Sequence, residues 1–220
     1  MNLLLITADQ WRADALGCAG HPCVRTPALD ALAADGLRFT RHFTQATPCG
    51  PARASLHTGL YALNHRSISN GTPLDARHDD LAAMLRRAGR RPTLFGYTDL
   101  SHDPRRLAPG DRRLHGYEGV YDGFEIGLRT DSAYRDWLAW LERSTGEAYR
   151  LDELFGRPLG EAPPYPAELS ETAFVTDAVL DHLQRHAGGD AWTLHVSYLK
   201  PHPPLVAPAP YHALYHPDDV

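Results

Sequence analysis

The stretch LLLIT at residues 3–7 is an apolar run of strand length, and it leads directly into polar residues up to Asp9. A short apolar run with polar residues after it is typical of a buried strand. Thr26 and Pro27 then mark a helix start, with proline at the first helical position, and Gly36 marks the stop. The chain therefore opens with a predicted buried strand followed by a helix over about 27–35.

The same alternation of strand and helix continues along the chain. Asp79 and Asp80 begin a second helical pattern, and TLFGY at residues 93–97 follows it as a buried strand. A further helix is predicted from about Ser170, and residues 192–199 then alternate like a strand. Such alternation predicts an α/β fold, with a mixed, mostly parallel sheet flanked by helices.

Two irregular stretches interrupt this pattern, at residues 99–121 and 156–166. Both are rich in turn-forming residues and show no sustained period, so we expect surface loops within one domain. Between them, apolar side chains recur at helical spacing and predict a core-facing helix rather than an aromatic binding site. These side chains are Tyr134, Trp137, Leu138 and Leu141.

The composition excludes several classes of protein. The 220 residues are 43% hydrophobic and 22% charged, and no apolar stretch approaches the length of a membrane span. The net charge of -5 gives no general attraction to nucleic acid or to anionic membranes. Three cysteines, an odd number, argue against a disulfide framework, and a cytoplasmic protein is expected.

The segment TPCGPARASLHTG at residues 47–59 carries the strongest chemical signal. Pro51 suits a first helical turn, which places Cys49 beside free backbone N–H groups and the positive end of a helix dipole. With Arg53 one turn in, such a helix start favours a sulfate or phosphate group held against residue 49. A thiolate nucleophile, as in phosphatases that use cysteine, fits the same position, and a lone buried cysteine would be only structural.

This segment resembles the sulfatases of the alkaline phosphatase superfamily, whose mark is Cys-x-Pro-x-Arg followed by Thr-Gly. The match runs from Cys49 to Gly59. The resemblance implies an alkaline phosphatase-like fold and oxidation of Cys49 to formylglycine, whose hydrated aldehyde is the nucleophile. It also implies a hydrolase of sulfate, phosphate or phosphonate monoesters or diesters. A covalent intermediate and a metal-activated hydroxyl are sound chemistry for such esters.

The resemblance also implies a metal site after the first strand, where members of the family place a carboxylate. Asp9 matches that position, and residue 49 shares the ion, which would be Ca2+ or Mn2+. Many sulfatases carry two adjacent acids there, whereas Gln10 follows Asp9 in this chain. This departure points toward the phosphonate monoester hydrolase branch, which is also similar at residues 47–55 and 60–66.

That branch places further groups around the transferred oxyanion. The resemblance assigns Asn70 and Tyr97 there as hydrogen-bond donors, and it leaves Asp99 without a role. His202, in the strand-to-turn segment SYLKPHPP at residues 197–204, would protonate the leaving oxygen or bind the oxyanion. The predicted catalytic group is therefore Cys49, Arg53, His202, Tyr97 and Asn70, with Asp9, Gln10 and Cys49 at the metal.

Members of the family continue well past 220 residues, and their remaining metal ligands and a catalytic lysine lie in that later segment. We therefore expect this chain to be the N-terminal part of a sulfatase catalytic domain and to be inactive alone. The expected partners are a small anionic ester and a formylglycine-generating or other sulfatase-maturing enzyme, and a homo-oligomer is left open. Two alternatives remain: a truncated or degenerate paralogue that binds an anion or a partner without turnover, and a phosphatase with an unmodified Cys49.

Overall fold

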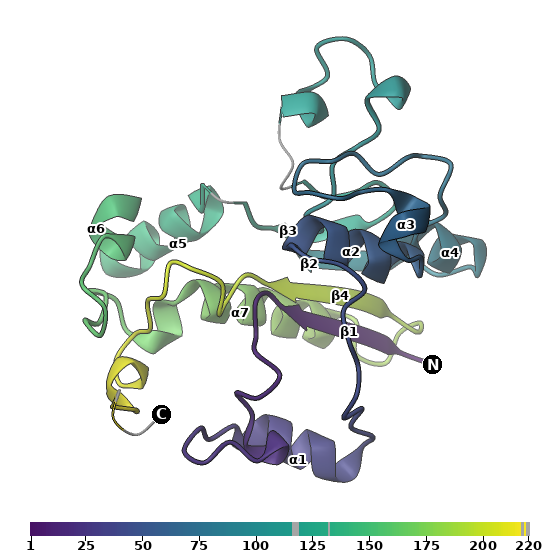
Figure 1. Ribbon diagram of the computed structural model, residues 1–220. Helices are drawn as coiled ribbons and strands as arrows, with labels where there is room; N and C mark the ends of the chain where they lie inside the picture. Colours follow the sequence, from purple (N-terminus) through teal and green to yellow (C-terminus); the bar gives the residue numbers. More distant parts are fainter. Residues whose placement is uncertain (116–118, 132, 217, 219–220) are drawn as a thin grey trace.

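A four-stranded parallel sheet organises the chain (Figure 1), and the computed structural model describes residues 1–115, 119–131, 133–216 and 218. The strand order is β1-β4-β2-β3, and every pairing between these strands is parallel. This confirms the expected α/β fold. The strands are β1 (Leu3–Ala8), β2 (Pro92–Gly96), β3 (Glu125–Arg129) and β4 (Thr193–Tyr198).

Seven α-helices occur in the described part of the chain. They are α1 (Pro27–Asp35), α2 (Cys49–Thr58), α3 (Ala62–His65), α4 (Leu81–Arg87), α5 (Arg135–Thr145), α6 (Leu151–Phe155) and α7 (Glu171–Arg185). None of the described helices combines the length and the apolar character that a bilayer span requires.

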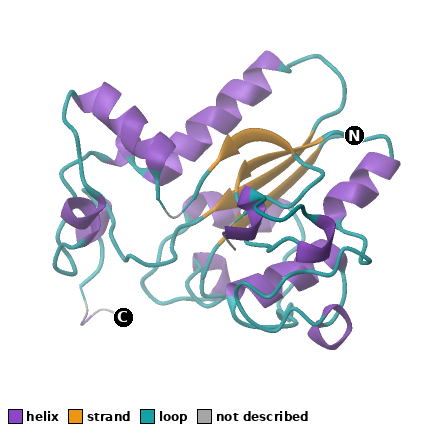
Figure 2. Cartoon of the chain, turned by 90° about the horizontal axis from the view of Figure 1, so that it is seen from above, coloured by secondary structure: helices purple, strands orange, loops and turns teal. Residues whose placement is uncertain are grey.

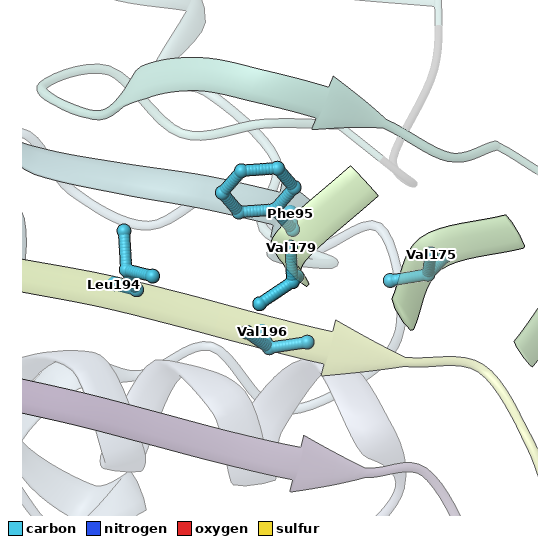
Figure 3. Close-up of a cluster of buried hydrophobic side chains, with 5 residues drawn as sticks. All are labelled: Phe95, Val175, Val179, Leu194 and Val196. Carbon is cyan, nitrogen blue, oxygen red and sulfur yellow. The ribbon is translucent and has the colours of Figure 1, made fainter. Parts of the chain in front are cut away.

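Helices cover both faces of the sheet because successive strand side chains point to opposite sides. On β2, Phe95 packs with Val175 and Val179 of α7, as Figure 3 shows. Its neighbour Leu94 packs on the other side with Ala82 of α4. Figure 2 shows the strands between helices from the second direction.

The first strand is less covered than its sequence predicts. Leu3, Leu4 and Ile6 are 37%, 44% and 56% exposed. The expectation of a buried strand is wrong here because β1 lies at the edge of the sheet, and α1 is set apart from it (Figure 1). An apolar run specifies a strand but not which neighbours cover it.

The bounds predicted for α1, α4, α7, β2 and β4 agree with the structure to within one or two residues, whereas α3 and α6 were not predicted. Ser170 caps α7 through its hydroxyl, which accepts a hydrogen bond from the amide of Ala173, and Asp80 caps α4 in the same way. The predicted aromatic stripe forms the buried side of α5, where Trp137 and Leu141 pack against Leu154 of α6. The strand β3 was not predicted.

The two irregular stretches differ in their secondary structure, and both contribute buried residues. Within 99–121 the described residues form two short 3₁₀ helices, Pro104–Arg106 and Arg112–His115. Leu100 and Tyr121 from this segment enter the core beside α2. Residues 156–166 have no helix or strand, and Tyr165 among them is buried.

Candidate active site

Most of the predicted site residues meet at the carboxyl ends of the parallel strands. Asp9 follows β1 and Tyr97 follows β2, while His202 lies in the turn after β4. They line one cavity of about 330 Å3 together with Cys49 and Asn70. Open α/β sheets bind ligands at this edge, so the topology itself gathers these side chains.

The helix α2 is fixed to the sheet by its buried side. Ala54 packs with Leu74 and Leu100, and the ring of His57 lies 5.3 Å from that of His195 on β4. Burial lowers the pKa of His57 to about 3 and that of His195 to about 4, so both rings are neutral packing groups at physiological pH. The first residue of this anchored helix is Cys49.

Asn70 connects to both the thiol and the backbone at this helix start. Its amide nitrogen donates to Cys49 Sγ at 3.1 Å, and its amide oxygen accepts from the Gly50 N–H at 2.9 Å. A Cβ on Gly50 would lie 3.1 Å from that oxygen, so glycine suits the close approach. Asn70 thus fixes the direction of the side chain at position 49.

The Cys49 thiol is not in a thiolate-stabilising environment. Burial raises its pKa, and the neighbouring Asp99 raises it further, whereas the hydrogen bond from Asn70 acts in the opposite direction. An anionic thiolate would face the negative charges of Asp99 and Asp9. The geometry therefore disfavours an unmodified cysteine as the nucleophile at neutral pH.

Arg53 does not line the 330 Å3 cavity; it is buried and borders a neighbouring cavity that Asp9 and Cys49 also line. It is 6% exposed, and its Nη1 donates to Ser197 Oγ at 2.9 Å and to the Tyr97 carbonyl at 3.3 Å. Its Nη2 lies 3.4 Å from Asp9 Oδ2, and its guanidinium carbon lies 4.3 Å from the centre of the Tyr97 ring. These contacts position Asp9 and Tyr97; a direct contact of Arg53 with substrate stays a prediction.

Tyr97 is a neutral donor in this arrangement. Its hydroxyl donates to Asp9 Oδ2 at 2.5 Å, and burial is the main cause that raises the pKa of Tyr97 far above its ordinary value. The one phenolic proton is thus directed at Asp9. Tyr97 can donate to a substrate oxyanion, as predicted, only if its hydroxyl proton leaves Asp9 Oδ2.

Asp9 lies at the cavity wall with its two carboxylate oxygens in different surroundings, and its role as a metal ligand stays a prediction. Tyr97 and Arg53 both bind Oδ2, while Oδ1 accepts no hydrogen bond from the described part of the chain. Gln10 is exposed, has a positive φ of 59° and borders a second cavity with Asp9 and Cys49. These are oxygen donors of the kind that Ca2+ and Mn2+ prefer.

His202 faces the cavity from the turn after β4. Its Nδ1 lies 2.7 Å from the Pro203 carbonyl oxygen, which can only accept, so Nδ1 carries a proton. The remaining nitrogen, Nε2, is left to exchange a proton with a bound molecule. The ammonium group of Lys200 donates to the carbonyls of His202 and Pro204 and braces the turn.

Several cavity residues were not predicted from the sequence. Thr130 and Asp131 follow β3 directly, as Asp9 follows β1, and they enter the site because β3 lies in the same parallel sheet. Recognition of that strand would have indicated them. The apolar wall comes from Tyr134, Leu151, Phe155 and Leu199.

Comparison with known proteins is consistent with this geometry. The chain is 39% identical over 233 residues to the multifunctional alkaline phosphatase superfamily protein PehA of Trinickia caryophylli, covering all of this chain and 45% of PehA. It is 25% identical to an arylsulfatase of Clostridium perfringens, covering all of this chain and 47% of that protein. The chain thus spans about half the length of these relatives.

Solved structures give the same relationship. The phosphonate monoester hydrolase of Agrobacterium radiobacter matches with a TM-score of 0.92 and 46% identity, over 99% of this chain and 44% of that one. The enzyme SpPMH from Silicibacter pomeroyi matches with the same score and coverage at 42% identity. The sulfatase family model matches residues 1–219, and the chain therefore belongs to the sulfatase family.

Proposed function

We propose that this protein hydrolyses sulfate, phosphate or phosphonate monoesters or diesters through a formylglycine made from Cys49. The main observation in support is that Cys49, the first residue of α2, lines one cavity with Asp9, Asn70 and His202. The substrate is a small anionic ester. The names of the relatives, an arylsulfatase and two phosphonate monoester hydrolases among them, support this class.

Modification explains features that a free thiol does not. The pKa of Cys49 is raised by burial and by Asp99, so a thiol there would remain largely protonated and weakly nucleophilic. When present, the hydrated aldehyde supplies the attacking hydroxyl and keeps a second hydroxyl for later product release. Asn70, which donates to the atom on the residue-49 side chain, would orient that hydroxyl.

The divalent cation in this proposal, Ca2+ or Mn2+, is held by Asp9, Gln10 and the modified residue 49. The free oxygen of Asp9 supports this assignment, although no group of three His, Cys, Asp or Glu side chains with metal-site geometry occurs among the described residues. When bound, such an ion lowers the pKa of the attacking hydroxyl and offsets the charge of the ester. A hard cation takes six or more oxygen ligands, so this set supplies part of the shell.

The remaining residues act on the ester directly or hold in place the groups that do. As an imidazolium, His202 could give its Nε2 proton to the leaving oxygen and become neutral, while its Nδ1 proton stays on the Pro203 carbonyl. Arg53 keeps Asp9 in place and offsets its charge, and the neutral Tyr97 would donate to the ester if its hydroxyl proton moved away from Asp9 Oδ2. The residues thus divide into nucleophile, metal ligand, proton donor and supporting groups.

The proposal includes a maturing partner, since formylglycine requires an enzyme that oxidises the cysteine side chain. All three cysteines are unpaired in the structure, which supports a reducing compartment such as the cytoplasm. Cys18 and Cys23 lie outside the site cavity and serve as internal references for modification.

A substrate panel combined with metal chelation tests this function. The full-length protein, of which this chain is expected to be the N-terminal part, is co-produced with a formylglycine-generating enzyme. It is assayed on matched aryl sulfate, phosphate monoester, phosphate diester and phosphonate monoester substrates. We expect turnover of at least one of them, loss of turnover with a chelator, and recovery with Ca2+ or Mn2+. Turnover that survives chelation would instead indicate an unmodified Cys49 phosphatase, and anion binding without turnover would indicate a non-catalytic relative.

A further inference from the structure

A further cavity, which Cys49 does not border, lies beside the candidate active site. It measures about 710 Å3, and it shares Phe155 and Pro204 with the cavity around Cys49. Much of its wall is apolar, and aromatic side chains contribute to it: Trp137, Phe155 and Tyr165. Its size matches a small-molecule site.

One side chain in this wall is a buried carboxylate of a kind that is rare in a protein core. Glu171, the first residue of α7, is 3% exposed, and both of its carboxylate oxygens lack a hydrogen-bond partner within the described residues. A buried carboxylate without a partner is costly, and burial raises the pKa of Glu171 to about 7. Such a group requires an explanation beyond packing.

The nearby cation does not provide that partner. Lys200 lines the same cavity, but its ammonium group donates to the carbonyls of His202 and Pro204, at 3.3 and 2.7 Å, and lies 5.2 Å from the centre of the Phe155 ring. Among the described residues neither carboxylate oxygen of Glu171 accepts a hydrogen bond from Lys200, although the positive charge of Lys200 acts to lower the pKa of Glu171 against the larger effect of burial. The hydrogen bonds of the Lys200 ammonium group therefore go to the turn after β4 and not to the Glu171 carboxylate.

We propose that this cavity binds a guanidinium group, paired with both oxygens of Glu171. A guanidinium presents two parallel N–H donors in one plane, which satisfies two carboxylate oxygens at once, whereas an ammonium is a point charge. Its weakly hydrated face also stacks on aromatic rings, which this wall provides. The bidentate pair thus accounts for both the unpartnered acid and its aromatic surroundings.

The first experiment uses isothermal titration calorimetry to compare a guanidinium with a neutral compound of the same shape and with an ammonium of the same charge. Ethylguanidinium is titrated into the protein at pH 8 beside ethylurea, its neutral counterpart, and ethylammonium. We expect ethylguanidinium to bind, ethylurea to show no binding, and ethylammonium to bind several-fold more weakly. Equal binding of ethylurea, or preference for ethylammonium, would overturn the assignment.

The source of the guanidinium is resolved by a second pair of ligands. A short peptide with a central arginine is compared with the same peptide carrying citrulline, which is isosteric and neutral. Tighter binding of the arginine peptide than of ethylguanidinium identifies a polypeptide side chain as the source, and the reverse order identifies a free small molecule. Failure of both guanidinium ligands to bind would refute the site.

Two variants separate the role of Glu171 from general effects of charge. Glu171→Gln keeps the shape of the side chain and should weaken ethylguanidinium binding by about 30-fold, since one partner of a buried charged pair is lost. Glu168→Gln is the matched control, because Glu168 borders the cavity but is exposed. Thermal unfolding of each variant confirms folding, and unchanged affinity in folded Glu171→Gln would contradict the proposal. This outcome does not depend on ester hydrolysis, so it fails or succeeds separately from the proposed function.

Discussion

The cavities around Cys49 and Glu171 differ in whether their buried carboxylates have partners within the chain. Beside Cys49, Asp9 is bound by both Arg53 and Tyr97, so its negative charge has partners within the chain. Beside Glu171, both carboxylate oxygens lack such partners among the described residues. The difference teaches that buried charges paired internally hold a site in shape, while an unpaired one marks where a ligand of opposite charge belongs.

The largest expected effect concerns the residue at the start of α2. Cys49→Ala removes the precursor of the nucleophile, and we expect kcat to fall by about 10⁴-fold or more, as for other enzymes that lose a covalent nucleophile. Steady-state kinetics on an aryl ester measure this. Cys18→Ala is the control. If Cys49→Ala keeps full activity, the cavity around Cys49 is not the active site.

The internally paired charges should also dominate stability. Arg53→Ala leaves Asp9 without its cation and Ser197 without its donor, and we expect about 3–5 kcal/mol less free energy of unfolding. Urea unfolding measures it. Arg87→Ala, which breaks the exposed ion pair with Asp79, should change stability by about 0.5 kcal/mol at most. If Arg53→Ala and Arg87→Ala lose the same free energy of unfolding, burial does not make the Arg53–Asp9 pair more stabilising than an exposed pair.

The unpaired charge predicts a pH dependence of the opposite sign from that of a paired acid. The pKa of Glu171 rises from about 4.5 unfolded to about 7 folded, so the folded state holds the proton more tightly. Its contribution to stability is full below pH 4.5 and falls by about 3 kcal/mol as the pH rises through 7.

Urea unfolding at a series of pH values between 4.5 and 8 checks this slope. Glu171→Gln should reduce the slope and leave the protein more stable at pH 8, whereas Glu168→Gln should leave the slope unchanged. If wild type and Glu171→Gln show the same slope, Glu171 is solvated or paired, and the contrast between the two cavities disappears.

The smallest expected effect sharpens the role of the hydrogen bond to Asp9. Tyr97→Phe removes only the hydroxyl, and we expect kcat to fall by about 100-fold, in the range seen when one donor is removed from an active site. Tyr61→Phe, at an exposed tyrosine, is the control. A fall in stability without any change in kcat would make Tyr97 a packing residue.

Much of the fold could be predicted because its elements carry strong local patterns. The apolar run TLFGY indicated β2, the helix start at Ser170 indicated α7, and Trp137 with Leu141 indicated the buried side of α5. The strand β3 escaped because EIGLR has no continuous apolar run and takes its structure from pairing with β2. The exposure of β1 depends on its place in the strand order, which no local pattern specifies.

The grouping of the predicted site residues could be expected where motif and topology coincide, while their roles stay predictions. The structure places Asp9, Cys49, Asn70, Tyr97 and His202 around one cavity, whereas the pairing of Arg53 with Ser197 joins residues far apart in the chain and depends on the folded sheet. Glu171 could not be found, because as the first residue of a helix it is an ordinary acid at the helix N-terminus. Only its burial in the folded chain makes it unusual.

The central claim is tested most directly by mass spectrometry of the peptide that contains Cys49. The protein is produced with a formylglycine-generating enzyme, and the peptides with Cys18 and Cys23 serve as internal references. We predict an aldehyde in place of the thiol at position 49 and intact thiols at positions 18 and 23. A peptide that carries only thiol at position 49, from protein that is active on an ester, would contradict the account.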